Sequence, residues 1–241
     1  MARARMSRSE LKARDEITTT LERLTENAMT RKNEIVVGLV VLLVLAAGFF
    51  GWRYYSSSKN AAAQGQLANV ISAFQDTTVK EDKERFEKTI VAAQKTMADY
   101  SGSKAASLAQ YYTALSQDGL GDMPNAVKNL EEVIARGDSD TKPIAQFALA
   151  SVYKRNNELQ KAVDVLKQLD ASGGFTKAVV AYELGSAAEA ANQKDVAQTA
   201  YSKVVTESAD SPFRSDAEAA LKRMGLPIPT PVQTLPQVEV K

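Results

Sequence analysis

The chain has 241 residues, 44% of them hydrophobic, and a formal net charge of +1 at neutral pH. It contains neither cysteine nor histidine, which excludes disulfides, thiolate metal sites, cysteine nucleophiles and Ser-His-Asp catalysis. Residues 35–241 hold 22 basic and 23 acidic side chains, so this part lacks the basic excess of a nucleic-acid-binding domain. We therefore expect a non-enzyme with no catalytic residue, no cofactor, no metal and no small-molecule substrate.

Residues 1–34 are predicted to form a partly helical cytoplasmic segment with eight basic and six acidic side chains. Ser7 and Glu10 have the spacing of a capping box, which favours a helix start. Apolar residues between positions 17 and 28 then recur at 4-3-4 spacing on one helical face. This narrow stripe suits a solvated helix, and pairing with another helix or contact with a membrane surface stays open.

Residues 35–52, IVVGLVVLLVLAAGFFGW, are eighteen consecutive uncharged and mostly apolar residues. A helix of this length is about 27 Å long, close to the roughly 30 Å hydrocarbon core of a bilayer. Trp52, Tyr54 and Tyr55 cluster at one end, and such side chains favour the headgroup layer. A buried core helix would carry a polar face, which this run lacks. The run therefore predicts a single transmembrane helix.

The orientation of this helix follows from the basic residues on its two sides. Eight Lys or Arg residues precede position 35, whereas residues 53–79 hold two, so the N-terminus is expected in the cytoplasm and the larger part across the membrane. A cleavable signal peptide is the alternative, because Ala46, Ala47 and Gly48 are small enough for a peptidase. The long preceding segment and the apolar continuation to Trp52 favour an uncleaved anchor.

Three local patterns resemble catalytic or metal motifs but have simpler explanations. Ser56–Lys59 formally allows a Ser/Lys dyad, and a flexible polar exit from the span explains it better. Gly119–Gly121 lacks the third glycine and the preceding strand of a dinucleotide fingerprint. Asp138 and Asp140 lack the other ligands of a calcium loop, so a solvated loop is the better interpretation.

Three stretches of the chain align without gaps when Ala126, Ala162 and Ala197 are superposed, at spacings of 36 and 35 residues. In each stretch a small residue lies twelve positions earlier and a large apolar residue four positions later. This is the helix-turn-helix register of the tetratricopeptide repeat, whose period is about 34 residues. Its small residues allow helices to approach closely, while large residues fill the space between repeats. The aligned pairs are Ala114 with Leu130, Ala150 with Leu166, and Gly185 with Tyr201.

The alignment predicts an all-α fold, in which one transmembrane helix precedes a tetratricopeptide-like α-solenoid over residues 53–225. An ordinary all-α bundle is the alternative. A helix pair at 60–76 and 81–100 is expected before the repeats, and a capping helix from Ser211 to Met224, with Pro212 in its first turn, after them. Residues 226–241 contain four prolines and are expected to be extended or disordered.

Position 5 of the first helix in such repeats commonly faces the concave groove, and here it is aromatic three times: Tyr111, Phe147 and Tyr182. We predict a groove that binds an extended or helical protein segment with apolar anchors and an acidic group. The alternatives are that the rings fill space between helices, or that the proline-rich tail occupies the groove. The predicted groove residues are Leu108, Tyr111, Leu115, Ile144, Phe147, Ser151, Lys154, Arg155, Val179, Tyr182 and Ser186.

The span ending in Gly51–Tyr55, the alanine-rich helix after it and the motif DYSGSKAASLAQYYTAL at 99–115 resemble the YfgM-like ancillary subunits of the bacterial SecYEG translocon. The resemblance covers residues 35–225, while the N-terminal segment is longer and more basic than the family pattern and the proline-rich tail is extra. It implies an inner-membrane protein whose periplasmic repeats contact the translocon, a membrane-anchored periplasmic chaperone and emerging secreted chains. A scaffold for cell-envelope assembly or cell division, built on the same repeats, is the competing interpretation.

Overall fold

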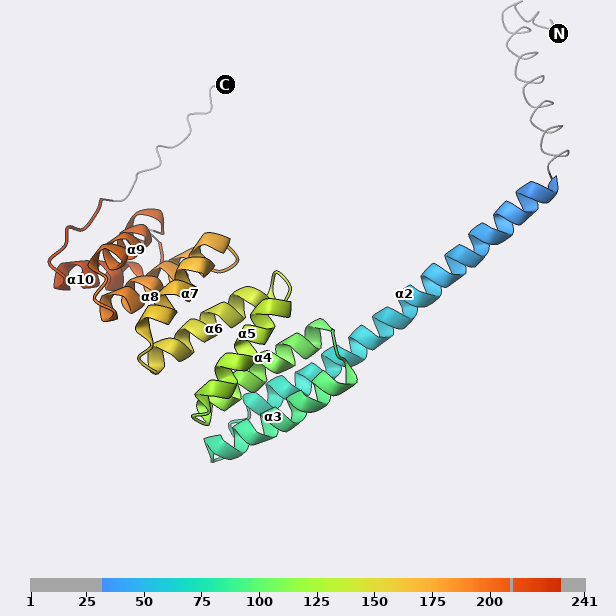
Figure 1. The fold of residues 1–241 in the computed structure, drawn as a ribbon, viewed down its shortest axis with the longest axis horizontal. Helices are drawn as coiled ribbons and strands as arrows, with labels where there is room; N and C mark the ends of the chain where they lie inside the picture. Colours follow the sequence, from blue (N-terminus) through green and yellow to red (C-terminus); the bar gives the residue numbers. More distant parts are fainter. Residues whose placement is uncertain (1–31, 209, 231–241) are drawn as a thin grey trace, which may run out of the picture. The chain divides into compact units, whose positions relative to one another are not determined.

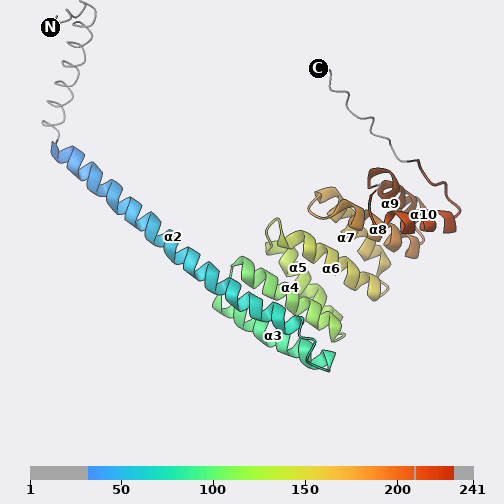
Figure 2. The same cartoon turned by 180° about the vertical axis from the view of Figure 1, so that it is seen from behind.

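The computed structural model describes residues 32–208 and 210–230, without the side chains of 32–39, 51, 52 and 54–56. These described residues form nine α-helices joined by short connections (Figures 1 and 2). In chain order they are α2 (Lys32–Phe74), α3 (Asp82–Asp99), α4 (Lys104–Gly119), α5 (Met123–Arg136), α6 (Thr141–Arg155), α7 (Leu159–Ser172), α8 (Lys177–Ala190), α9 (Lys194–Glu207) and α10 (Arg214–Arg223).

The chain divides into two compact units, Met1–Ser58 and Lys59–Lys241, and α2 continues from the first into the second. Within the part of the chain that the structure describes, no helix is long and apolar enough to cross a membrane. Of the predicted span at 35–52, the side chains of residues 35–39, 51 and 52 lie outside the description. The predicted helix within residues 1–31 and the tail from residue 231 onward also lie outside the described residues.

The second unit consists of helix pairs that follow one another, so that α4 pairs with α5, α6 with α7 and α8 with α9 (Figure 1). Each pair is joined by a tight turn with one residue in the left-handed backbone region: Gly121, Asn157 and Asn192, with φ of 79°, 59° and 58°. Glycine and asparagine are the residues that tolerate this conformation best. The three turns are in register with the predicted repeats, and the helical-repeat fold is confirmed.

The core of the second unit lies between successive helices and contains the residues that the alignment singled out. All three small residues and all three large residues of the aligned pairs are buried. A smaller apolar cluster joins the end of α2 to α3 and α4, through residues such as Leu67, Val70 and Ala93. The expected helix pair before the repeats therefore exists, as the end of α2 and α3. The predicted capping helix begins later than expected, because α10 starts at Arg214 and leaves Pro212 in the preceding turn.

Candidate protein-binding face

The predicted groove residues lie on α4, α6 and α8, the first helices of the three repeats. Ten of the eleven are partly exposed and Arg155 is exposed. Counted from the aromatic residue of each helix, the members lie three residues before it and four, seven or eight after it. At about 100° per residue these offsets share one face of a helix. Many of the side chains between them, such as those of Ala145, Ala148 and Leu184, are buried in the repeat core.

Two of the three aromatic residues on this face stack on a second ring from the loop before the next repeat. Phe147 stacks on Phe175, with ring centroids 4.9 Å apart and planes inclined by 14°. Tyr182 stacks on Phe213, with centroids 5.1 Å apart. These two rings therefore fill space between repeats and also present partly exposed surface. The sequence analysis did not identify Phe175 or Phe213; their sequence signal is a lone aromatic residue shortly before a helix start.

Tyr111 has a different environment from the other two aromatic residues. Its ring makes an edge contact with Tyr112, its neighbour on α4, with centroids 5.5 Å apart. Tyr112 in turn contacts Phe74 at the end of α2. Burial raises the pKa of the Tyr111 phenol above its ordinary value. Among the described residues, the Tyr111 hydroxyl has no hydrogen-bond partner.

The two cations of the predicted groove are paired with carboxylates of neighbouring repeats. Lys154 donates from Nζ to Glu183 Oε2 over 2.7 Å and to Ser186 Oγ over 3.0 Å. Arg155 forms an ion pair with Asp118 at the end of α4. These contacts join α6 to α8 and to α4. They also neutralise the positive charge on this part of the face, so that an acidic group of a partner would have to compete with Glu183 and Asp118.

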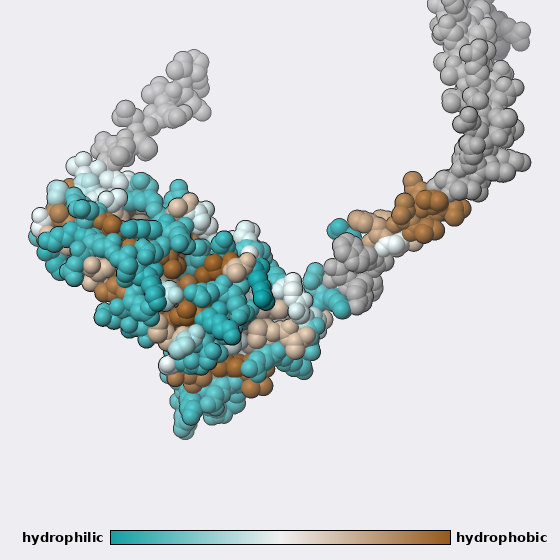
Figure 3. All heavy atoms as spheres, viewed as in Figure 1, coloured by the Kyte–Doolittle hydropathy of each residue, from teal (hydrophilic) through white to brown (hydrophobic). Residues whose placement is uncertain are grey.

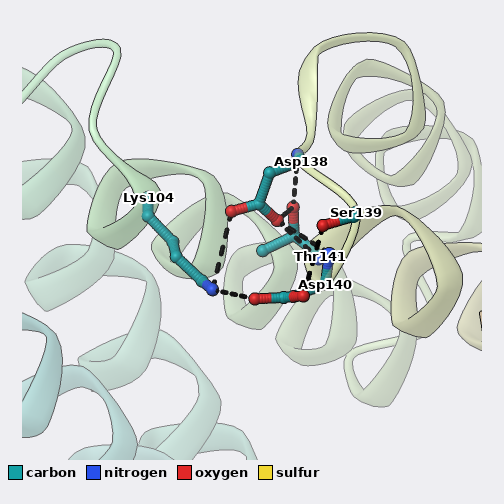
Figure 4. Close-up of polar contacts among 5 residues, drawn as sticks. All are labelled: Lys104, Asp138, Ser139, Asp140 and Thr141. Carbon is teal, nitrogen blue, oxygen red and sulfur yellow. Dashed lines mark hydrogen bonds and ion pairs between the residues drawn. The ribbon is translucent and has the colours of Figure 1, made fainter.

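A second ionic cluster lies at the other end of the face, where the α5–α6 loop meets the start of α4 (Figure 4). Lys104 contacts the carboxylates of both Asp138 and Asp140, the former with 3.5 Å between Nζ and Oδ2. The hydrogen bond to Asp140 raises the pKa of Lys104 above its ordinary value. No group of side chains that could hold a metal ion occurs among the described residues.

Asp138 also fixes the first turn of α6. Its Oδ1 accepts hydrogen bonds from the backbone N–H of Thr141 over 2.8 Å and from that of Asp140 over 3.1 Å. The Thr141 hydroxyl donates to the same oxygen over 2.8 Å and accepts from the Asp138 backbone N–H over 3.0 Å. The backbone and side-chain hydrogen bonds from Thr141 lower the pKa of Asp138 to about 2. Asp138 is therefore a capping residue rather than a free loop carboxylate.

A bidentate ion pair anchors the last helix to the third repeat. Arg223 on α10 donates to both carboxylate oxygens of Glu189 on α8, over 2.8 to 3.0 Å. The Tyr201 hydroxyl on α9 donates to Glu189 Oε2 over 2.9 Å. Burial, followed by this hydrogen bond, raises the pKa of Tyr201 well above its ordinary value. Glu189 lies seven residues after Tyr182 and so on the same face as the predicted groove.

Three surface hollows lie on other faces of the second unit. One is lined by residues 68–77 at the end of α2, one by the outer face of α3 around Val91, and one by the polar outer face of α9. The candidate binding face is a row of partly exposed apolar side chains on three successive helices. Such a surface suits an extended contact with a protein segment better than an enclosed small molecule.

The family model for the tetratricopeptide repeat-like domain matches residues 30–222 of the chain. The chain belongs to this family. Two solved structures with a similar fold are a kinesin light chain protein of Podosopora anserina with nearly identical tetratricopeptide-like repeats and a point variant of it. The variant is 23% identical and has a TM-score of 0.54, over 69% of this chain and 88% of its own. The parent is 20% identical and has a TM-score of 0.50, over 70% and 86%.

A comparison with curated proteins found no match. The family and the structural likeness thus show the helical-repeat fold, which presents extended surfaces for binding other proteins. The tetratricopeptide-like protein is accordingly an interaction scaffold in its general function.

Proposed function

We propose that the protein is a membrane-anchored, non-catalytic interaction protein whose repeats lie in the periplasm and assist the Sec translocon and a periplasmic chaperone with secreted chains. The observation that carries the binding role is the row of partly exposed apolar side chains on three successive first helices. In each helix an aromatic residue and an aliphatic residue three positions before it lie side by side on one face. Partly buried aromatic side chains are the residues that most often dominate protein–protein contacts.

The membrane anchor is supported by the apolar run in the first unit. Eight of its large apolar side chains between Val40 and Phe50 are more than half exposed, with values from 52% to 68%. They appear as the apolar surface on α2 in Figure 3. Apolar side chains exposed all around a helix are stable in a lipid environment and unfavourable in water. The eight basic residues before position 35 favour a cytoplasmic N-terminus.

The anchor is tested by charge insertion. Replacing Leu43 and Val44 by lysine should move the protein from the membrane fraction to the soluble fraction, because each central charge costs about 2.5–3.5 kcal/mol. The matched control replaces the same two residues by alanine and should remain in the membrane. External protease added to spheroplasts should digest the repeats of the wild-type protein and spare its N-terminal segment. Repeats that stay protected until the membrane is broken would contradict the proposed topology.

The assignment to the translocon rests on the resemblance to YfgM-like subunits in the span and in residues 99–115. It is tested by purifying the full-length protein in a mild detergent and identifying the co-purifying proteins by mass spectrometry. Translocon subunits and a membrane-anchored chaperone are the expected result. Enrichment of wall-synthesis or division proteins instead would favour the envelope scaffold, and the lysine variant of the anchor serves as the control for nonspecific capture.

A further inference from the structure

The eleven residues of the candidate binding face divide into seven apolar or aromatic side chains and four polar ones. Each of the four polar side chains already has a partner within the protein. Lys154 donates to Ser186 over 3.0 Å and to Glu183 over 2.7 Å. Arg155 pairs with Asp118, and the remaining serine donates to a carbonyl oxygen of its own helix. The apolar side chains are therefore the part of the face that is left for a partner.

Ion pairs also account for the other charges on this face of the three first helices. α4, α6 and α8 carry eight charged residues, and six of them are in ion pairs. The other two, Lys142 and Lys177, lie five residues before Phe147 and Tyr182, which is about 140° around the helix and so directed away from this face. The six paired residues are Lys104, Asp118, Lys154, Arg155, Glu183 and Glu189.

Glu183 and Asp118 hold the two cations of the face from neighbouring helices. Lys154 lies seven residues after Phe147, two turns along the same side of α6, and Glu183 reaches it from α8. The side chains of Lys154 and Glu183 are 34% and 30% exposed, and that of Asp118 is 14% exposed. An acidic group of a partner would have to displace one of these carboxylates and leave it partly buried without its cation, which is unfavourable.

We propose that Glu183 and Asp118 determine the specificity of the face: by pairing Lys154 and Arg155, they make it bind apolar, uncharged protein segments and discriminate against acidic ones. This differs from the acidic anchor group that the sequence led us to expect. The occupant is an exposed apolar stretch of an unfolded chain, because such a stretch supplies aliphatic and aromatic side chains and brings no charge that the face would leave unmatched. The inference rests on the proposed function, that this face binds protein segments, and names the class of segment.

The test compares the binding of labelled peptides to the full-length protein in lipid nanodiscs, by fluorescence anisotropy with empty nanodiscs as the baseline. The probe is blocked Ser-Gln-Leu-Ala-Phe-Gln-Leu-Ala-Phe-Gln-Ser, and its charged versions carry glutamate or lysine in place of one glutamine at a time. The wild-type protein should bind the glutamine peptide at least as tightly as every charged version. Tighter binding of a charged version would overturn the proposal, as would a lack of peptide binding by protein that captures translocon subunits.

Variants of the protein free the two cations one at a time. Glu183→Gln and Asp118→Asn should each make a glutamate version bind about threefold to fivefold more tightly than the glutamine peptide, the upper range for an exposed ion pair. Adding Lys154→Gln to Glu183→Gln should abolish this acquired preference. Asp170→Asn is the matched control, because it breaks an ion pair between the second helices α7 and α9 and frees Lys203. It should leave the wild-type preferences unchanged.

The structural alternative is that the two ion pairs only hold neighbouring helices together. In that case Glu183→Gln and Asp118→Asn lower the melting temperature and leave the ratio of the affinities for the glutamate and glutamine peptides at its wild-type value, which contradicts the proposal. The acquired preference should also weaken as the salt concentration rises from about 50 to about 300 mM, because salt screens ionic attraction. A preference that does not respond to salt would likewise count against the proposal.

The outcomes for the two proposals are distinguishable. Unchanged peptide preferences in both variants, with translocon subunits still captured by the wild-type protein, overturn the role of Glu183 and Asp118 and leave the proposed function standing. The expected switch in preference, with no translocon subunit captured, supports the inference and overturns the proposed partner.

Discussion

A Cβ atom placed on Gly185 would lie 2.7 Å from both Cδ1 and Cε1 of Tyr201. In the other two repeats the same positions hold alanine and leucine, as Ala114 with Leu130 and Ala150 with Leu166. The third repeat thus combines a smaller residue on α8 with a larger one on α9. The space between the two helices is filled in each case, because protein interiors are closely packed.

The contact between Gly185 and Tyr201 predicts that the effect of Gly185→Ala on the free energy of unfolding changes sign with the residue at position 201. In the wild-type protein the added methyl group should overpack against the Tyr201 ring and destabilise by about 1 kcal/mol, the net of an overpacking cost of about 1–3 kcal/mol and a gain in helix propensity of about 1 kcal/mol. In a Tyr201→Leu background the same change should stabilise, since the ring is gone. Chemical denaturation of the four proteins measures this. Equal effects in both backgrounds would contradict the packing argument.

The repeat register could be predicted from the sequence because it depends on residue size at a fixed period. The need for small residues at Ala150 and Gly185, and for left-handed turns at Asn157 and Asn192, follows from local steric constraints. Such constraints can be recognised in a single sequence without knowledge of the tertiary contacts. The start of α10 was predicted three residues too early. Pro212 fits the first turn of a helix as well as it fits the turn before a helix. Helix ends depend on such alternatives more than helix interiors do.

The contacts on the binding face could not be predicted to the same extent. Phe175 and Phe213 follow their stacking partners by 28 and 31 residues, so no fixed period reveals them. The ion pair of Lys154 with Glu183 joins different repeats and depends on the side-chain conformations of both. Sequence spacing placed Lys154 on the face of α6 that carries Phe147 and left its ion-pair partner unidentified. Packing patterns can thus be predicted from one sequence, whereas ion pairs between repeats can be identified only in the folded structure.

Asp138 gives the protein a predictable acid dependence. Its pKa in the folded protein is about 2, below the value of about 3.9 for an unfolded chain, so its ionised form stabilises the fold. That contribution is complete above about pH 5 and is lost as the pH falls through 4 towards 2. Asp138→Asn should therefore lower the melting temperature at pH 7 and flatten its decline between pH 5 and 2. A decline as steep as that of the wild type would contradict this role.

Tyr201 gives a dependence of the opposite sign at high pH. Burial and the bond to Glu189 raise its pKa in the folded state, so the protonated phenol stabilises the fold. This contribution is fully present below the unfolded value of about 10 and is lost as the pH rises through the folded value. Ultraviolet titration should show fewer tyrosines ionising in the normal range in the folded wild-type protein than after unfolding, because the pKa values of Tyr111, Tyr153 and Tyr182 are also raised, and Tyr201 should titrate last. In Tyr201→Phe this late-titrating group should be absent, and stability at neutral pH should fall by about 1 kcal/mol.

The binding face itself is tested by removing its rings. Phe147→Ala combined with Tyr182→Ala should abolish capture of partner proteins while helicity is retained. Because both rings also stack between repeats, some loss of melting temperature is expected, so capture is measured well below the melting transition. Val91→Ala on the outer face of α3, where Val91 is 67% exposed, is the matched control and should capture normally.

A second variant adds bulk to the same face without removing anything from the core. Ser151 lies four residues after Phe147 and is partly exposed, and its hydroxyl donates to the Phe147 carbonyl oxygen of the same helix over 3.0 Å. Ser151→Gln should extend a longer side chain over the apolar surface and weaken capture, with little change in stability, since exposed helix positions accept glutamine readily. Reduced capture by both variants places the contact on this face. Undiminished capture by folded protein carrying either change would move the binding site to another face of the repeats.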